Sequence, residues 1–144
     1  MSKCLSNTAL DAYRKDGYYF PVPVLSPAEV AHARKCLEEH EVKIGGPLQG
    51  NFRHKAHLLF TWVDELVHHP KILDAAEDVL GPNLLCWTTN FFIKEANSAG
   101  FVSWHQDAFY WGLNKDTVMV LAVGAAVVSA KLILLSRADR ADEE

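Results

Sequence analysis

Residues 101–113 read FVSWHQDAFYWGL, and the run Trp104-His105-Gln106-Asp107 within them decides how the chain is interpreted. Side chains on a β-strand alternate between its two faces, so His105 and Asp107 point to the same face of an extended segment. An imidazole nitrogen and a carboxylate oxygen placed in this way can bind one metal ion with little backbone distortion. They supply two of the three ligands of the 2-His-1-carboxylate triad, which leaves positions on Fe(II) open for other ligands.

The third ligand of such a triad is a histidine well downstream of the motif, yet no His follows position 105 in this chain. A His-x-Asp spacing by itself is weak evidence. In a chain with seven His and 18 acidic residues among 144, this spacing often occurs by chance, and a solvated surface pair is the alternative interpretation. The residues around the motif therefore decide its interpretation.

Those surrounding residues resemble a known family. Asn90–Lys94 (NFFIK), a short glycine-containing loop and the run SWHQDAFYWGL are similar to the phytanoyl-CoA dioxygenase family. The upstream run LLFTW (58–62) and the run DELVHHPKILDAAEDVLGP (64–82) fit the helical region of the same family. The resemblance covers about residues 8–120 and is most specific over 87–113. It implies a non-haem Fe(II), 2-oxoglutarate-dependent oxygenase, which uses O₂ to hydroxylate a C–H bond of a small molecule or acyl compound.

The resemblance also implies roles for individual residues. His105 and Asp107 would bind Fe(II), and Lys94, on the strand before the motif, would help to hold the carboxylate of 2-oxoglutarate. A solvated strand end is the alternative for Lys94. Gln106 should point away from the metal, because side chains alternate along a strand. Aromatic residues flank the metal pair and would line the mouth of the substrate pocket, unless they only fill the core. These residues are Trp104, Tyr110 and Trp111.

Local signals predict four helices in the first part of the chain. The strongest is Ser26-Pro27-Ala28-Glu29, because Ser is a favoured N-cap, Pro suits the first helical position and Glu completes a capping box. Gly45 should end this helix. The first of the other three should cover residues 9–16, with Asn7 or Thr8 as its cap and Gly17 as its stop. The next should run through His68 with a cap formed by Thr61 and Asp64, and the last from Pro70 to Leu80. Residues 48–57 should form a loop, and His32 and His40 should be solvated on their helix.

Strands are predicted after these helices. Residues 84–94 are rich in β-branched and aromatic side chains, and residues 101–110 should form the next strand, which carries the metal pair. The expected fold class is therefore α+β, with N-terminal helices followed by strands. The resemblance implies that these are the first strands of an incomplete double-stranded β-helix, a jelly-roll or cupin-like barrel. A complete barrel has about eight strands, and this chain offers at most half of them.

The family pattern is predicted to occupy residues 1–118, and residues 119–144 form a divergent apolar tail. Relatives continue with a Trp-containing strand, a distal His and an Arg that binds 2-oxoglutarate, so we expect this chain alone to be impaired. Three explanations of the tail stand side by side. It follows from a shifted frame or alternative splicing, it is a short variant that pairs as strand or helix, or it is a membrane-anchoring helix. Between Asp116 and Lys131 there are 14 uncharged residues, fewer than the ~20 that span a bilayer.

Composition limits the remaining functions. With 49% hydrophobic and 22% charged residues, the chain resembles one ordinary globular domain. A net charge of −4 without a basic cluster argues against nucleic-acid binding. Three cysteines without CxxC spacing and no apolar signal segment indicate a cytoplasmic protein with reduced thiols. A second hypothesis is a non-catalytic fragment or pseudoenzyme that associates with itself or a full-length relative through exposed strands and the tail. A zinc-binding cupin-like protein has little support, because we recognise no zinc-type spacing of Cys and His.

Overall fold

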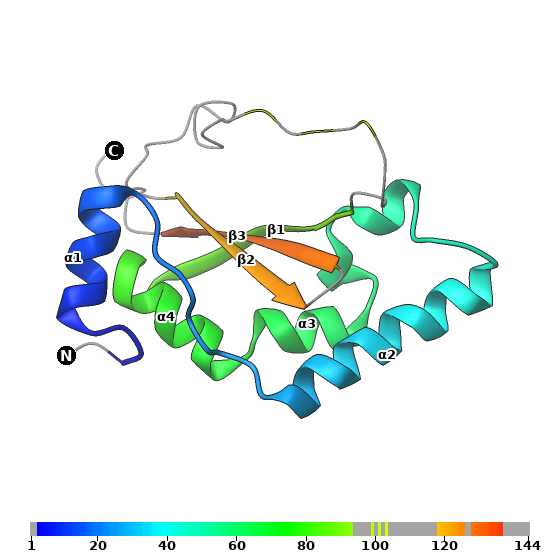
Figure 1. The fold of residues 1–144 in the computed structure, drawn as a ribbon, viewed down its shortest axis with the longest axis horizontal. Helices are drawn as coiled ribbons and strands as arrows, with labels where there is room; N and C mark the ends of the chain where they lie inside the picture. The colour runs from blue at the N-terminus through cyan, green and yellow to red at the C-terminus, as the bar shows by residue number, and fades with distance from the viewer. Residues whose placement is uncertain are drawn as a thin grey trace, which may run out of the picture.

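The computed structural model describes residues 3–93, 99, 101, 103, 118–125 and 128–136. Within this part, helices come first and strands follow, so the predicted order is confirmed (Figure 1). The strands pair side by side, and α3 and α4 lie against them. The elements are α1 (Asn7–Asp16), α2 (Pro27–Ile44), the 3₁₀ helices η1 (Gly50–Arg53) and η2 (Ala56–Leu58), α3 (Thr61–Val67), α4 (Pro70–Leu80), and the strands β1 (Leu84–Phe92), β2 (Val118–Ala125) and β3 (Val128–Ser136).

The capping box predicted for α2 is confirmed. The Ser26 hydroxyl oxygen accepts a hydrogen bond from the Glu29 backbone N–H at 3.3 Å, and Glu29 Oε2 accepts one from the Ser26 N–H at 2.7 Å. These two bonds satisfy backbone donors that the first turn of a helix leaves without partners. The helix ends at Gly45, whose φ of 77° lies in the left-handed region that favours glycine.

Two other predicted caps are wrong. Ser6, rather than Asn7 or Thr8, caps α1, because the Ser6 hydroxyl accepts the Ala9 backbone N–H at 3.1 Å. The helix begins at Asn7, two residues before the predicted start at Ala9. Thr61 lies inside α3, which starts after Phe60 without a side-chain cap. Phe60 is packed against the buried cluster around Leu37, so tertiary packing fixes the start of this helix. The predicted loop at 48–57 contains η1 and the start of η2.

The sheet has the order β1-β3-β2, and both pairings are antiparallel. Asn90 lies opposite Lys131 in one pairing, and Leu121 lies opposite Leu132 in the other. Most of the apolar tail is therefore strand in this structure, which corresponds to the explanation in which the tail pairs with the rest of the fold. Among the described residues, no helix is long and apolar enough to cross a membrane.

A β-bulge at Trp87 interrupts the regular pairing of β1 with β3, between Cys86 and Thr88. An extra residue in one strand reverses which face the following side chains point to. Before the bulge, Cys86 packs against the buried cluster that contains Val67. After the bulge, Phe91 belongs to the buried cluster that contains Val63. Val63 and Val67 are four residues apart in α3 and lie on one side of it. Both halves of β1 thus pack against the same helical layer.

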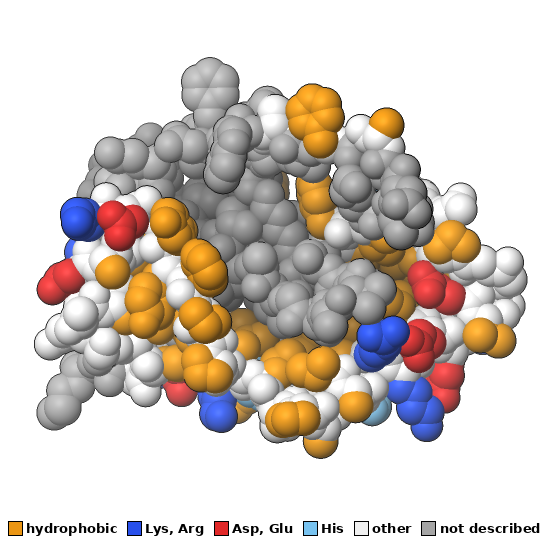
Figure 2. Space-filling view, viewed as in Figure 1, with side chains coloured by type: hydrophobic (Ala, Val, Ile, Leu, Met, Phe, Trp, Pro, Cys, Tyr) orange, Lys and Arg blue, Asp and Glu red, His pale blue; other side chains and the backbone are white. Residues whose placement is uncertain are grey.

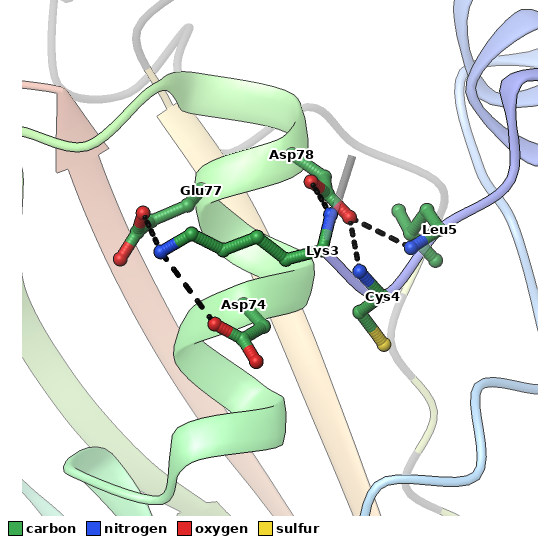
Figure 3. Close-up of polar contacts among 6 residues, drawn as sticks. All are labelled: Lys3, Cys4, Leu5, Asp74, Glu77 and Asp78. Atoms are coloured by element: carbon green, nitrogen blue, oxygen red, sulfur yellow. Dashed lines mark hydrogen bonds and ion pairs between the residues drawn. The ribbon is translucent and has the colours of Figure 1, made fainter. Parts of the chain in front are cut away.

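Helix α1 is joined to α4 through the N-terminal segment. The carboxylate of Asp78 accepts the backbone N–H groups of Lys3, Cys4 and Leu5, each at 2.7 Å, and Lys3 Nζ lies 2.6 Å from Glu77 Oε2 (Figure 3). Desolvation raises the pKa of Asp78, but the three N–H donors and Lys3 outweigh it and lower the pKa below its ordinary value. The carboxylate therefore stays ionised and holds this segment in place.

Candidate functional site

The end of β1 is the described part of the molecule nearest in sequence to the predicted site. Phe92 is the last residue of the strand, and Ile93 directly precedes Lys94. The predicted metal ligands, the predicted co-substrate lysine and the aromatic residues predicted to line the pocket all lie outside the described residues, as does the predicted strand 101–110 apart from residues 101 and 103. These residues are His105, Asp107, Lys94, Trp104, Tyr110 and Trp111.

The two faces of β1 differ in their surroundings at this end. Phe91 is 5% exposed and is packed under the helices together with Ile93, whereas Phe92 is 49% exposed. Because side chains alternate along a strand, Asn90 shares the face of Phe92. One face of the strand is therefore filled by the hydrophobic core, and the other presents polar and aromatic groups away from the helices.

His54 lies at the edge of β1 that does not pair with β3. Its backbone forms an isolated antiparallel bridge with Asn90, and its ring Nδ1 lies 3.1 Å from Asn90 Oδ1. The amide oxygen is an acceptor, so this contact is a hydrogen bond in the tautomer that carries the proton on Nδ1. This contact and the backbone bridge hold His54 beside the strand.

His57 is held on β1 by the buried hydroxyl of Thr89. Thr89 is 3% exposed, and its Oγ1 lies 3.0 Å from the backbone N of His57 and 2.8 Å from the ring Nδ1. Burial lowers the pKa of His57 below 6.5, and nearby Lys55 and His68 lower it further, although Asp64 acts in the opposite direction. The imidazole is therefore neutral at pH 7, and the contact fixes η2 on the strand.

These contacts position the strand and do not form a metal centre. Within the described ranges, no group of three His, Cys, Asp or Glu side chains is placed to hold a metal ion. Sequence reasoning missed the partners of both histidines. The available signal was the polar run Thr88-Thr89-Asn90 within the otherwise apolar strand LLCWTTNFF, because buried polar side chains in a strand require hydrogen-bond partners.

Comparison with known proteins assigns this arrangement to a family. The model of the phytanoyl-CoA dioxygenase family matches residues 13–131, which is most of the chain. The chain belongs to the phytanoyl-CoA dioxygenase family. The resemblance seen in the sequence is confirmed, and the matched residues include the whole run 101–113 as well as β1 and β2.

Two solved structures are similar to this member of the phytanoyl-CoA dioxygenase family. The non-haem monooxygenase ThoJ in a nickel complex is 30% identical with a TM-score of 0.63, and the match covers 88% of this chain and 66% of that one. The apo form of ThoJ is 26% identical with a TM-score of 0.64, and the match covers 88% and 69% of the two chains. The chain thus spans about two thirds of the length of these structures. A search of curated proteins gives no match.

Proposed function

We propose that this chain carries the metal-binding and co-substrate-binding strands of a non-haem Fe(II), 2-oxoglutarate-dependent dioxygenase. The substrate would be a small molecule or acyl compound with an unactivated C–H bond. The run SWHQDAFYWGL carries this proposal, since it combines a His-x-Asp pair with the region that matches the family model. The similarity to a non-haem monooxygenase supports it. The strands would be the first strands of a double-stranded β-helix.

His105 and Asp107 are the residues that would bind the iron. A neutral imidazole and a carboxylate suit Fe(II), so the chemistry of this donor pair fits the metal. When bound, iron, 2-oxoglutarate and O₂ together supply the oxidation of the C–H bond. The protein contributes orientation of the substrate and exclusion of water. Trp104, Tyr110 and Trp111 would form the apolar wall that performs both tasks.

Lys94 would bind the carboxylate of the co-substrate. Asn90 and Phe92 lie on the face of β1 that the helices leave uncovered. We propose that the alternation continues to Lys94, which would then share this face. An ammonium group there would attract an anionic co-substrate, and the His54–Asn90 contact would keep the end of the strand in position.

We further propose that the centre is weak in this chain. His105 and Asp107 are two ligands where the triad has three, and no His follows them within the 144 residues. With fewer ligands, iron should dissociate more readily, and the absence of the family's arginine should weaken binding of 2-oxoglutarate.

The test measures Fe(II) binding without oxygen, and then succinate formation from 2-oxoglutarate, for the purified full chain. Weak Fe(II) binding that both H105A and D107A abolish, with little succinate, supports the proposal. Gln106→Ala is the matched control, because this side chain should point away from the metal. Iron binding that is unchanged in H105A and D107A refutes the ligand assignment. Succinate formation far above the H105A control refutes the impairment.

Association with another chain is the second candidate function. Large apolar side chains are exposed, including Phe20 at 76% and Leu58 at 71%. Figure 2 shows hydrophobic side chains gathered on the left and along the lower part of one face. In the described sheet, β2 is an edge strand that pairs only with β3. An edge strand offers unpaired backbone groups to another strand. We propose that self-association or pairing with a full-length relative covers these surfaces.

A further inference from the structure

A hollow of about 440 Å³ lies between α2 and the segment that leads into α3. Its volume is within the range of about 300–1,000 Å³ typical of ligand pockets. One side is formed by polar side chains of α2, and the opposite side is largely apolar. The lining residues are His32, Cys36, Glu39 and His40 from α2, and Leu59, Phe60, Thr61, Trp62 and Glu65 from the other side.

His32 and Cys36 form a close pair in this hollow. They are four residues apart on α2, so they are neighbours on one face of the helix, and His32 Nε2 lies 3.7 Å from Cys36 Sγ. Zinc binds imidazole nitrogen at about 2.0–2.1 Å and thiolate sulfur at about 2.3 Å in tetrahedral geometry. Two such ligands on one ion lie ~3.6 Å apart. The observed separation therefore matches that of two ligands of a single tetrahedral ion.

Glu39 supplies a third donor on the same face of α2. It is three residues beyond Cys36, and its carboxylate has an ion pair with Lys35 at 3.7 Å in which both side chains are well exposed. Exposed pairs of this kind contribute about 0–1 kcal/mol, so Glu39 can leave its partner at little cost. Among the described residues no three such side chains are already gathered, so two ligands are in place and Glu39 has to rotate.

We propose that His32, Cys36 and Glu39 bind a thiophilic divalent metal ion such as Zn²⁺, with water as the fourth ligand. A thiolate and a carboxylate together balance the charge of the ion, and the imidazole binds in its neutral form. Binding displaces the thiol proton, so the affinity should rise with pH. This site is separate from the proposed iron centre, whose ligands include no sulfur.

The surroundings favour such an ion. Phe60 and Trp62 form the apolar part of the opposite wall of the hollow, which is open to solvent. His40, expected from the sequence to be solvated, is instead packed 5.5 Å from Phe52 and 4.7 Å from Phe60 between ring centroids. Its Nε2 is buried and has no hydrogen-bond partner in the described part of the chain. A metal-bound water would supply that partner.

His32 and Cys36 do not follow the ligand spacings of zinc fingers and related domains, so their sequence pattern alone does not indicate a metal site. The spacing here is His-x₃-Cys. It places both side chains on one face because residues 27–44 form a helix. The helix itself was predicted from its capping box, so the pairing could have been derived from the sequence.

The test is titration of the full chain with Co²⁺, a spectroscopic substitute for Zn²⁺, while recording the near-ultraviolet absorption of a thiolate–cobalt bond. We expect a saturable band with one equivalent of metal, which competing Zn²⁺ removes. Cys36→Ser should abolish the band, and His32→Gln should weaken binding at least about tenfold. Glu39→Gln should weaken it less. Circular dichroism of each variant confirms that α2 remains folded.

Two controls make the assignment specific. Cys4 is an exposed free thiol outside the hollow, so Cys4→Ser should leave the band unchanged. His105→Ala should also leave it unchanged, which separates this site from the proposed iron centre. The proposal is overturned if wild-type protein gives no band, if the band survives in the Cys36→Ser variant, or if Cys4→Ser removes it.

Discussion

Replacing Thr89 by Val tests whether a single buried hydroxyl holds η2 on β1. Thr89 is 3% exposed, and its Oγ1 lies 3.0 Å from the backbone N and 2.8 Å from Nδ1 of His57. Valine has almost the same shape but no hydroxyl, so both contacts are lost while the packing of the strand is preserved. The backbone N–H and the ring nitrogen of His57 then lack their partner.

The expected cost follows from these two contacts. A neutral hydrogen bond contributes about 0.5–1.5 kcal/mol net, and a buried polar group without a partner costs about 1–3 kcal/mol. His57 is only partly buried, so water replaces part of what is lost. We expect the free energy of unfolding to fall by about 2 kcal/mol. For a chain of this length, this lowers Tm by about 6 °C.

The assay is urea denaturation followed by circular dichroism, together with thermal unfolding. Thr88→Val is the matched control, because Thr88 is the preceding residue in the same strand, is 9% exposed, and has no side-chain hydrogen bond among those described. The control should change the free energy of unfolding by less than about 0.5 kcal/mol. If the two variants are equally stable, the Thr89–His57 contact does not hold this segment and the reasoning is refuted.

Three further predictions concern charged contacts and assembly. The hydrogen bonds from Ser26 and His69 lower the pKa of Glu29 from 4.5 to about 2. The stabilising effect of the ionised carboxylate is therefore complete above pH 4.5 and is lost as the pH falls towards 2. The Tm of E29Q should depend less on pH over this range than the Tm of the wild type, and an unchanged pH profile would contradict this. D78N should lower the free energy of unfolding by about 2 kcal/mol, because three charge-assisted hydrogen bonds at a partly buried site are weakened. E77Q should have a smaller effect, and equal effects would contradict the role of Asp78. Size-exclusion chromatography should show species larger than a monomer, and a compact monomer would argue against association through β2 and the exposed apolar side chains.

The elements that could be predicted from the sequence are those fixed by neighbouring residues. The α2 capping box needs only Ser26 and Glu29, and its C-terminal stop needs only Gly45, so both are readable in a short window. The start of α3 could not be predicted in this way. Phe60 packs against residues of a different helix, and no side-chain cap marks the boundary. Long-range packing therefore overrode the local signal from Thr61.

In the candidate site, too, features set by neighbouring residues could be predicted, and contacts between distant residues could not. The metal pair His105 and Asp107 could be proposed from two residues and the period of a strand, and it stays a prediction, because both lie outside the described residues. The contacts of His57 with Thr89 and of His54 with Asn90 join residues 32 and 36 positions apart. No local sequence pattern identifies the partner of each histidine. A polar run inside an apolar strand indicates only that its side chains have hydrogen-bond partners.

Register decides what the end of β1 can do, and this is where the bulge at Trp87 matters most. Leu84 and Cys86 pack under the helices. If the side chains alternated without interruption along the strand, Lys94 would be assigned to this same face, which the core covers. The bulge lies between Cys86 and Thr88, so the faces are exchanged and Phe91 with Ile93 enters the core instead. The face of Asn90 is then the open one, and the proposed role of Lys94 depends on that exchange. A motif can thus identify ligands from a few residues, but the face on which a strand presents them follows from its register with its neighbours.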